Sequence, residues 1–127
     1  MEVKTTPFAM KYYRGKGWEV DVVERWIPAK WGKSGKGGFR KDLFGFGDLL
    51  MYNPALKQTA IVQVTDGSNS ASRRNKILQE RRAIEWLACG NKIFLCLTMA
   101  RIVKTKTKNA KSPTRRAYEI RDIEIVV

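Results

Sequence analysis

The stretch FGFGDLLMYNPALKQTAIVQVT, residues 44–65, places two apolar runs on either side of an Asn-Pro turn signal. Apolar runs of this length between turn residues are typical of buried strands, so we predict strands over 47–52 and 59–65. A four-residue loop over 54–57 would join them as an antiparallel hairpin in which Asn53 faces Gln58. This hairpin is the centre of the predicted fold.

The register of this hairpin places Asp48 directly opposite Gln63. Directly paired side chains share one face of a sheet, with Cβ atoms about 5 Å apart, and Thr65 points to the same face. Carboxylate and amide oxygens are ligands that Mg²⁺ and Mn²⁺ accept. We therefore predict a divalent-cation site at this position, with a salt-bridged or turn-capping Asp48 as the alternative. The prediction depends on the register, because a slip of one residue would reverse the faces.

The segments around the hairpin complete one α/β domain over 1–127. Thr6-Pro7 is a helix-start signal, and the apolar pattern after Ser68, Asn69 or Ser70 continues to a stop at Gly90. We predict a mixed β-sheet flanked by helices, in the order α-β-β-β-α-β-β. The other predicted elements are a helix over 7–16, a strand over 18–26, a helix from 68–70 to 88, strands over 92–103 and 118–127, and basic loops over 27–44 and 104–116.

The charge balance indicates a polyanionic partner. Lysine and arginine number 25 against 12 aspartate and glutamate, so the formal net charge is +13 over 127 residues. A hydrophobic content of 43% is too high for a disordered polycation. A folded domain with this charge is typical of a nucleic-acid-binding protein.

The predicted phosphate contacts lie mainly in the two basic loops and on the helix after the hairpin. A solvated linker is the alternative for the first loop, whose Trp31 is the best candidate for base stacking, followed by Phe39. Arg73 lies within the apolar stripe of the helix and Lys76 at its edge, so Arg73 needs an anion there or must reach out to solvent. The predicted contacts are Lys30, Trp31, Lys33, Lys36, Arg40, Lys41, Arg73, Arg74, Arg81, Arg82, Lys104, Lys106, Lys108, Lys111, Arg115 and Arg116.

Histidine is absent, which excludes a Ser-His-Asp triad, a histidine acid/base pair and a zinc site that contains histidine. Cys89 and Cys96 form no C-x-x-C motif, and we interpret both as reduced packing groups, with a disulfide as the alternative. No apolar run reaches the roughly 18 residues of a membrane span, and no apolar signal core follows Met1. We therefore expect a cytoplasmic protein without a membrane partner.

The string RKDLFGFGDLL over 40–50, then the hairpin, IVQVT over 61–65 and a helix resemble the core of PD-(D/E)xK nucleases. Within that superfamily the chain is most similar to the small archaeal-type Holliday junction resolvases and their phage-encoded relatives. The resemblance covers nearly the whole chain. It implies a restriction-endonuclease-like fold, a symmetric homodimer, and the host cytoplasm if the protein is viral. The apolar C-terminal strand offers a surface for such a dimer.

The resemblance also implies a catalytic site. In the family, an Asp on one strand and an E-x-K on the next bind Mg²⁺ and position a water. Here the slots hold Asp48 and Gln63-Val64-Thr65, so the implied metal ligands are Asp48, Gln63 and the Val64 carbonyl, with Lys76 or Lys41 in place of the motif lysine. The first helix carries no glutamate, although many family members bind metal there.

The resulting prediction is a Mg²⁺- or Mn²⁺-dependent, structure-selective endonuclease that hydrolyses phosphodiester bonds in branched or duplex DNA. One alternative is a catalytically inactive nuclease fold that binds DNA or RNA as an accessory or packaging protein. Another is a basic ribonucleoprotein component that prefers RNA.

Overall fold

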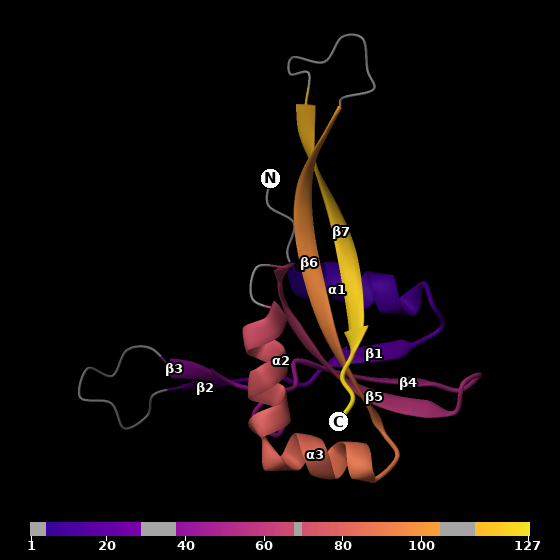
Figure 1. Cartoon of the computed structure of the whole chain (residues 1–127), viewed down its shortest axis with the longest axis vertical. Helices are drawn as coiled ribbons and strands as arrows, with labels where there is room; N and C mark the ends of the chain where they lie inside the picture. Colours follow the sequence, from indigo (N-terminus) through magenta and orange to yellow (C-terminus); the bar gives the residue numbers. More distant parts are fainter. Residues whose placement is uncertain (1–4, 29–37, 68–69, 105–113) are drawn as a thin grey trace.

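The computed structural model describes residues 5–28, 38–67, 70–104 and 114–127. A five-stranded sheet has the order β1-β4-β5-β6-β7, with β5 and β6 parallel and the other neighbours antiparallel (Figure 1). The predicted single α/β domain with a mixed sheet is thus confirmed, although the order of elements differs in detail. The strands of this sheet are β1 Glu19–Val22, β4 Leu49–Asn53, β5 Gln58–Asp66, β6 Lys92–Lys104 and β7 Thr114–Glu124.

The predicted hairpin is present in the predicted register. Strands β4 and β5 pair from Asn53↔Gln58 to Leu49↔Val62. The Asn53 side chain closes the turn, since its Oδ1 accepts hydrogen bonds from the amides of Ala55 at 3.1 Å and Leu56 at 3.2 Å. The turn chemistry that the sequence displays at Asn53-Pro54 therefore sets the face on which each strand residue lies.

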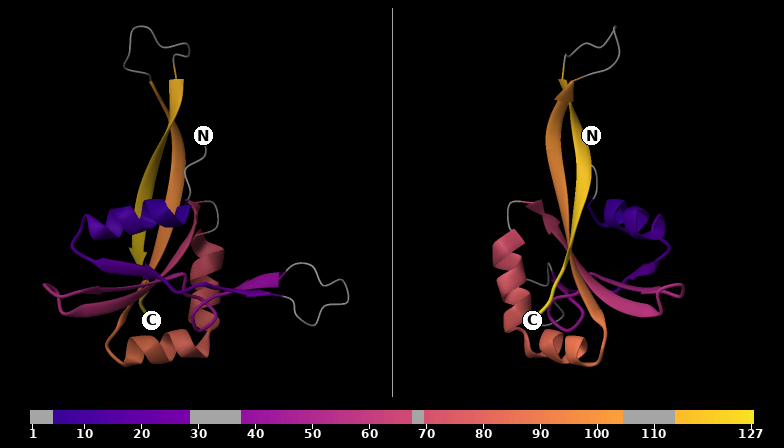
Figure 2. Two further views of the ribbon diagram at one scale, coloured as in Figure 1. Left: turned by 180° about the vertical axis from the view of Figure 1, so that it is seen from behind. Right: turned by 45° about the vertical axis from the view of Figure 1, so that its right-hand side comes forward.

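Helices cover the sheet from both sides (Figure 2). Helix α1, Thr5–Arg14, buries Ala9 and Tyr13 against one apolar cluster, which includes Val62 of β5. Helices α2, Ser70–Gln79, and α3, Arg81–Ala88, pack on a second cluster that includes Ile61, the neighbour of Val62. Because neighbouring residues of a strand point to opposite faces, these two clusters are the two sides of one sheet.

The single helix predicted up to residue 88 is instead two helices. Glu80 has extended backbone angles (φ −83°, ψ 117°) and separates α2 from α3. Its carboxylate accepts a hydrogen bond from the Arg82 amide and therefore caps α3. The same carboxylate forms an ion pair with the Arg82 side chain at 3.0 Å. Helix α1 also differs slightly, since it begins at Thr5 and ends at Arg14.

The first basic loop and the strand over 18–26 were predicted wrongly. Strand β1 ends at Val22, and two further strands, β2 Arg25–Pro28 and β3 Gly38–Lys41, pair as an antiparallel ribbon that projects from the main sheet (Figure 1). The chain between these strands, with the predicted contacts Lys30, Trp31, Lys33 and Lys36, lies outside the described residues.

The second basic loop is shorter than predicted. Strands β6 and β7 stay paired as far as Lys104↔Thr114, so Lys104, Arg115 and Arg116 belong to strands. The predicted contacts Lys106, Lys108 and Lys111 lie outside the described residues. The two strands extend well beyond the helices as a long ribbon (Figure 2).

The two cysteines have different environments. Cys96 is buried in the core, as predicted, and both thiols are free. Cys89 is exposed just after α3, so its interpretation as a packing group was wrong. In the part of the chain that the structure describes, no helix has the length and apolar character needed to cross a bilayer.

Gly47 lies at a close approach of two backbone segments, which gives a test of the fold. A Cβ at Gly47 would lie 2.5 Å from Cγ2 of the buried Ile61 and 3.2 Å from the Leu43 carbonyl oxygen. We expect Gly47→Ala to lower the free energy of unfolding by about 1–3 kcal/mol, as overpacking typically does. Urea denaturation would measure this. Gly15→Ala is the matched control, because its nearest contacts are ordinary ones at 3.4–3.5 Å; an equal loss in both variants would contradict the packing at Gly47.

Candidate metal centre

Asp48 lies immediately before β4, where two hydrogen bonds hold it against β5. Its backbone amide donates to the Val62 carbonyl at 2.9 Å. Its carboxylate oxygen Oδ2 accepts a hydrogen bond from the Val64 amide at 2.8 Å. The sheet thus fixes the partly buried carboxylate in place.

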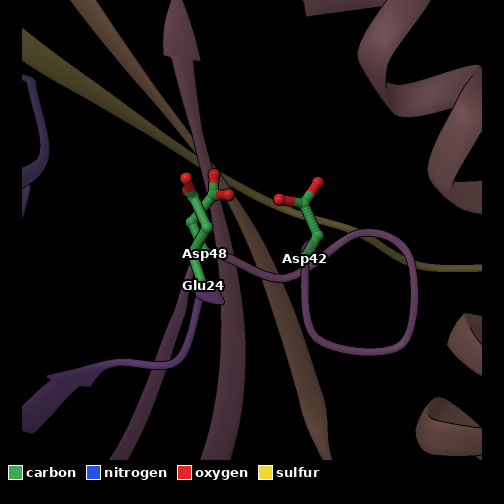
Figure 3. A group of neighbouring side chains, drawn as sticks. All are labelled: Glu24, Asp42 and Asp48. Atoms are coloured by element: carbon green, nitrogen blue, oxygen red, sulfur yellow. The ribbon is translucent and has the colours of Figure 1, made fainter. Parts of the chain in front are cut away.

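Two further carboxylates, of Glu24 and Asp42, come to the same point from the base of the β2–β3 ribbon. Arg25 pairs with Lys41 in the ribbon, so the residues just outside this pair, Glu24 and Asp42, also lie opposite each other. Figure 3 shows the Glu24 and Asp48 carboxylates side by side and that of Asp42 pointing toward them. One carboxylate oxygen from each of the three residues lies within 4.8 Å of the others.

A tight turn brings Asp42 close to Asp48 although five residues separate them. The amide of Leu43 donates to the Gly47 carbonyl, and the amide of Gly47 donates to the Leu43 carbonyl, both at 2.8 Å. The turn is closed in the left-handed region, with φ of 54° at Phe44 and 83° at Gly45. Backbone geometry therefore imposes the approach of the two acidic side chains.

The three carboxylates repel one another, and this alters the chemistry of Asp48. Burial is the largest cause that raises the pKa of Asp48, and with the neighbouring Asp42 and Glu24 it brings this pKa to about 7 against the lowering effect of the Val64 amide. Arg40 compensates part of the charge through an ion pair with Glu24 at 3.2 Å. A group of three carboxylates that share so little space can hold a metal ion.

Gln63 contributes a separate observation that supports a ligand at this place. The hairpin register, continued by one residue, sets Gln63 opposite Asp48 on the α2–α3 face, as the sequence predicts. The side chain is 4% exposed, and no hydrogen-bond partner for Oε1 is found within the described residues. A buried acceptor without a donor costs about 1–3 kcal/mol, so Gln63 is suited to a cation or a water carried by one.

The other predicted site residues have mixed outcomes. The Val64 amide donates to Asp48, whereas the role of the Val64 carbonyl as a metal ligand stays a prediction. Lys41 lies beside Asp42 at the end of β3. Lys76 and Arg74 are exposed on α2, whereas Arg73 is partly buried there, in agreement with its predicted place on the inner face.

The carboxylates are accessible from solvent. Glu24 and Asp42 line a hollow of about 580 Å³ that also contains the cationic Arg25, Lys41 and Arg82. A second hollow, of about 590 Å³, lies on the other side of Glu24 and contains Arg25 and Arg40. A negatively charged ligand would thus meet cations around a small acidic centre, an arrangement suited to a phosphate that shares a metal ion with the protein.

Sequence reasoning identified Asp48 and Gln63 but missed Glu24 and Asp42. The signal was present, since antiparallel pairing of 25–28 with 38–41 places residues 24 and 42 opposite each other. It was hidden because the intervening segment is rich in glycine and lysine, which are typical of loops.

Comparisons with protein-family models, curated protein sequences and solved structures find no match for the chain.

The raised pKa of Asp48 predicts a pH-dependent stability in metal-free buffer. Because the folded-state pKa of about 7 exceeds the ordinary value of 3.8, this group stabilises the fold when protonated and loses that contribution as the pH rises toward 7. We expect the melting temperature of the wild type, measured in EDTA, to rise by about 3 °C or more from pH 8 to pH 5.5 relative to Asp48→Asn.

The comparison with Asp48→Asn isolates this group. The pKa of Asp122 is also raised by burial, so Asp122 contributes the same trend to both proteins. Asparagine retains an oxygen that can accept the hydrogen bond from the Val64 amide. If the melting temperatures of the two proteins changed with pH in parallel, Asp48 would have an ordinary pKa.

The acidic cluster also predicts stabilisation by divalent cations. At pH 8, Mn²⁺ or Mg²⁺ at 100 times its dissociation constant would stabilise the protein by about 2.7 kcal/mol. We expect Asp42→Asn and Asp48→Asn each to weaken Mn²⁺ binding at least tenfold in isothermal titration calorimetry. Glu19→Gln is the control, because Glu19 is an exposed carboxylate at the far end of β1, opposite Tyr52. Equal Mn²⁺ affinity in all four proteins would exclude a metal site at the cluster.

Proposed function

We propose that the protein is a metal-dependent nuclease that hydrolyses phosphodiester bonds in DNA. The observation that carries this proposal is the meeting of the Glu24, Asp42 and Asp48 carboxylates in one cluster. Phosphodiester hydrolysis needs a hard cation held by oxygen ligands and an approach for a polyanion. The acidic cluster supports the first requirement, and the surrounding cations and the net charge of +13 support the second.

The proposed relationship to PD-(D/E)xK nucleases, and to small Holliday junction resolvases among them, rests on topology and position. Asp48 precedes β4, the first strand of the hairpin, and Gln63 lies on β5, the second. Helices α2 and α3 then lead to β6, which is parallel to β5. Glu24 and Asp42 would supply the negative charge that Gln63 does not bring. The proposed ligand set thus extends beyond the Asp48, Gln63 and Val64 carbonyl that the resemblance implies.

The residues around the cluster have distinct roles in this proposal. Bound Mg²⁺ would supply an acidified water and positive charge for the attacked phosphate. Asp48, Asp42 and Glu24 would hold the ion, and Lys41 would neutralise the phosphate, since it borders the same hollow. Lys76, exposed on α2, is less well placed for this role but lies on the helix that covers the Gln63 face.

Nucleic acid would approach along the cationic surfaces. Arg25, Lys41 and Arg82 line the hollow at the cluster, and Arg40 borders the neighbouring one. The β2–β3 ribbon begins directly at Glu24 and Asp42, so a duplex held along the ribbon would pass beside the carboxylates. Binding to phosphates through this many cations would weaken steeply with salt.

A homodimer is part of the proposal because resolvases of this kind cut two strands in concert. The C-terminal residues offer an apolar surface, with Val126 56% exposed and Val127 88% exposed. They border a hollow of about 450 Å³ together with Ile84 and Leu87 of α3.

One specific observation favours a second function, that of a nuclease fold that binds DNA or RNA without cutting it. The slots of the E-x-K motif hold Gln63 and Thr65, neither of which carries a charge. If Lys41 does not replace the motif lysine, a bound phosphate would lack a neutralising group at the position where the family provides one.

A cleavage assay separates the two functions. The panel contains a four-way DNA junction, a flap, linear duplex, single-stranded DNA and a duplex RNA, each with Mg²⁺ or Mn²⁺. We expect junction or flap cleavage by the wild type, and a fall of about 10²–10³-fold in Asp48→Asn, the range for loss of one group that stabilises transition-state charge. Lys41→Ala should reduce the rate similarly if it replaces the motif lysine.

The control for this assay is Glu19→Gln, which removes an exposed carboxylate at the far end of β1. Equal cleavage by wild type and Asp48→Asn would show that the activity does not use this centre. Tight binding with no cleavage in either metal would establish the binding function, and preferential binding of RNA over the DNA junction would identify a ribonucleoprotein component.

A further inference from the structure

Phe44 is an exposed aromatic residue in an unfavourable backbone conformation beside the acidic cluster. Its φ is 54°, in the left-handed region that bulky side chains rarely adopt, and its side chain is 40% exposed. It belongs to the turn closed by Leu43 and Gly47, two residues after Asp42. Strained residues are concentrated at binding and catalytic sites, so the position of Phe44 points to a use for its ring.

Trp86 of α3 lies next to Phe44 and is held rigidly. The two ring centroids are 6.4 Å apart and the rings are tilted by 46°. The Trp86 Nε1 donates a hydrogen bond to the Lys92 carbonyl at 2.7 Å, which fixes the indole against the start of β6. Phe44, Arg82, Glu85, Trp86 and Cys89 line a shallow, mostly apolar hollow of about 230 Å³, in which Glu85 is the one carboxylate.

The aromatic hollow is continuous with the acidic one. Phe44 and Arg82 line both, and the larger hollow also contains Glu24 and Asp42. The ion pair between Arg82 Nε and Glu80 Oε1, at 3.0 Å, holds the guanidinium between the two. A ligand that reaches from one hollow to the other would therefore meet carboxylates suited to a metal-bound phosphate, then a fixed cation, then an aromatic surface.

We propose that Phe44 and Trp86 form a stacking site for one unpaired base next to the phosphate held at the acidic cluster. This inference rests on the proposed function and defines its substrate class as nucleic acid with an unpaired or splayed base beside the cut. A nucleobase has flat, apolar faces and is joined through its sugar to a phosphate. The aromatic hollow would take the base, and the neighbouring acidic hollow would take the phosphate with its metal ion. A continuous duplex keeps its bases stacked and offers no free face.

The sequence alone favours Trp31 and Phe39 for base stacking. Residue 31 lies outside the described part of the chain, whereas Phe44 borders the acidic hollow and its ring lies next to that of Trp86. Phe44 separates two glycines in the FGFG segment, and sequence periodicity gives no sign that its ring is exposed.

The test measures binding to a DNA flap in Ca²⁺, which occupies oxygen sites and commonly replaces Mg²⁺ without supporting hydrolysis. Two flaps are compared, identical except that one lacks the base at the unpaired nucleotide next to the branch. Stacking of one base is worth about a 5- to 150-fold difference in affinity, so we expect the wild type to prefer the intact flap by that factor. Phe44→Ala should reduce the preference to near unity, and Phe44→Tyr should retain it.

Two further variants separate stacking from folding. Phe44→Leu keeps an apolar side chain of similar size against Trp86 but has no flat face, so it should lose the preference while its melting temperature stays close to that of Phe44→Tyr. Tyr52→Ala removes another exposed aromatic ring, 54% exposed on β4 opposite Glu19, and should leave the preference unchanged.

Equal affinity of the wild type for the two flaps would overturn the stacking site but leave the proposed nuclease intact if that protein still cuts. A preference that persists in both Phe44→Ala and Phe44→Leu would also overturn it. Failure of the wild type to bind either flap would overturn the stacking site and the proposed function together.

Discussion

Electrostatic repulsion among three carboxylates is the constraint on which the site depends. Two full charges within 4.8 Å of each other at an effective dielectric constant of about 20 repel by at least roughly 3 kcal/mol, and the cluster contains three such pairs. A proton on Asp48 or a nearby cation relieves this repulsion, and burial together with the acidic neighbours raises the pKa of Asp48 and so favours the proton. A divalent cation would relieve the repulsion without removing any ligand.

The fold brings these charges together by backbone geometry that repulsion cannot easily undo. Paired strands fix Glu24 and Asp42 at the base of the ribbon, the closed turn at Leu43 and Gly47 fixes Asp42 relative to Asp48, and the Val64 amide holds Asp48. The ladder and the turn are held by backbone hydrogen bonds, and Asp48 is held by a backbone amide that donates to its side chain. The centre is therefore preorganised for a cation.

The sequence predicts those parts of the site that local chemistry determines. Asn53-Pro54 and the flanking apolar runs determine a loop length, and loop length determines the register that sets Asp48 opposite Gln63. The ribbon could not be predicted in this way, because its short strands flank a segment of glycine and lysine, which lack strand propensity. The helix break at Glu80 was missed for a similar reason, since the apolar periodicity continues through it and glutamate is not a preferred cap.

The neutral side chain at position 63 has a physical explanation once Glu24 and Asp42 are taken into account. A carboxylate there would be a fourth anionic group, buried to 4% exposure and opposite Asp48, where desolvation alone favours its protonation. An amide offers a similar oxygen to a cation without adding to the repulsion. A neutral glutamine at position 63 thus suits a centre whose charge comes from Asp48 and from the base of the ribbon, and no partner for its buried Oε1 is found among the described residues.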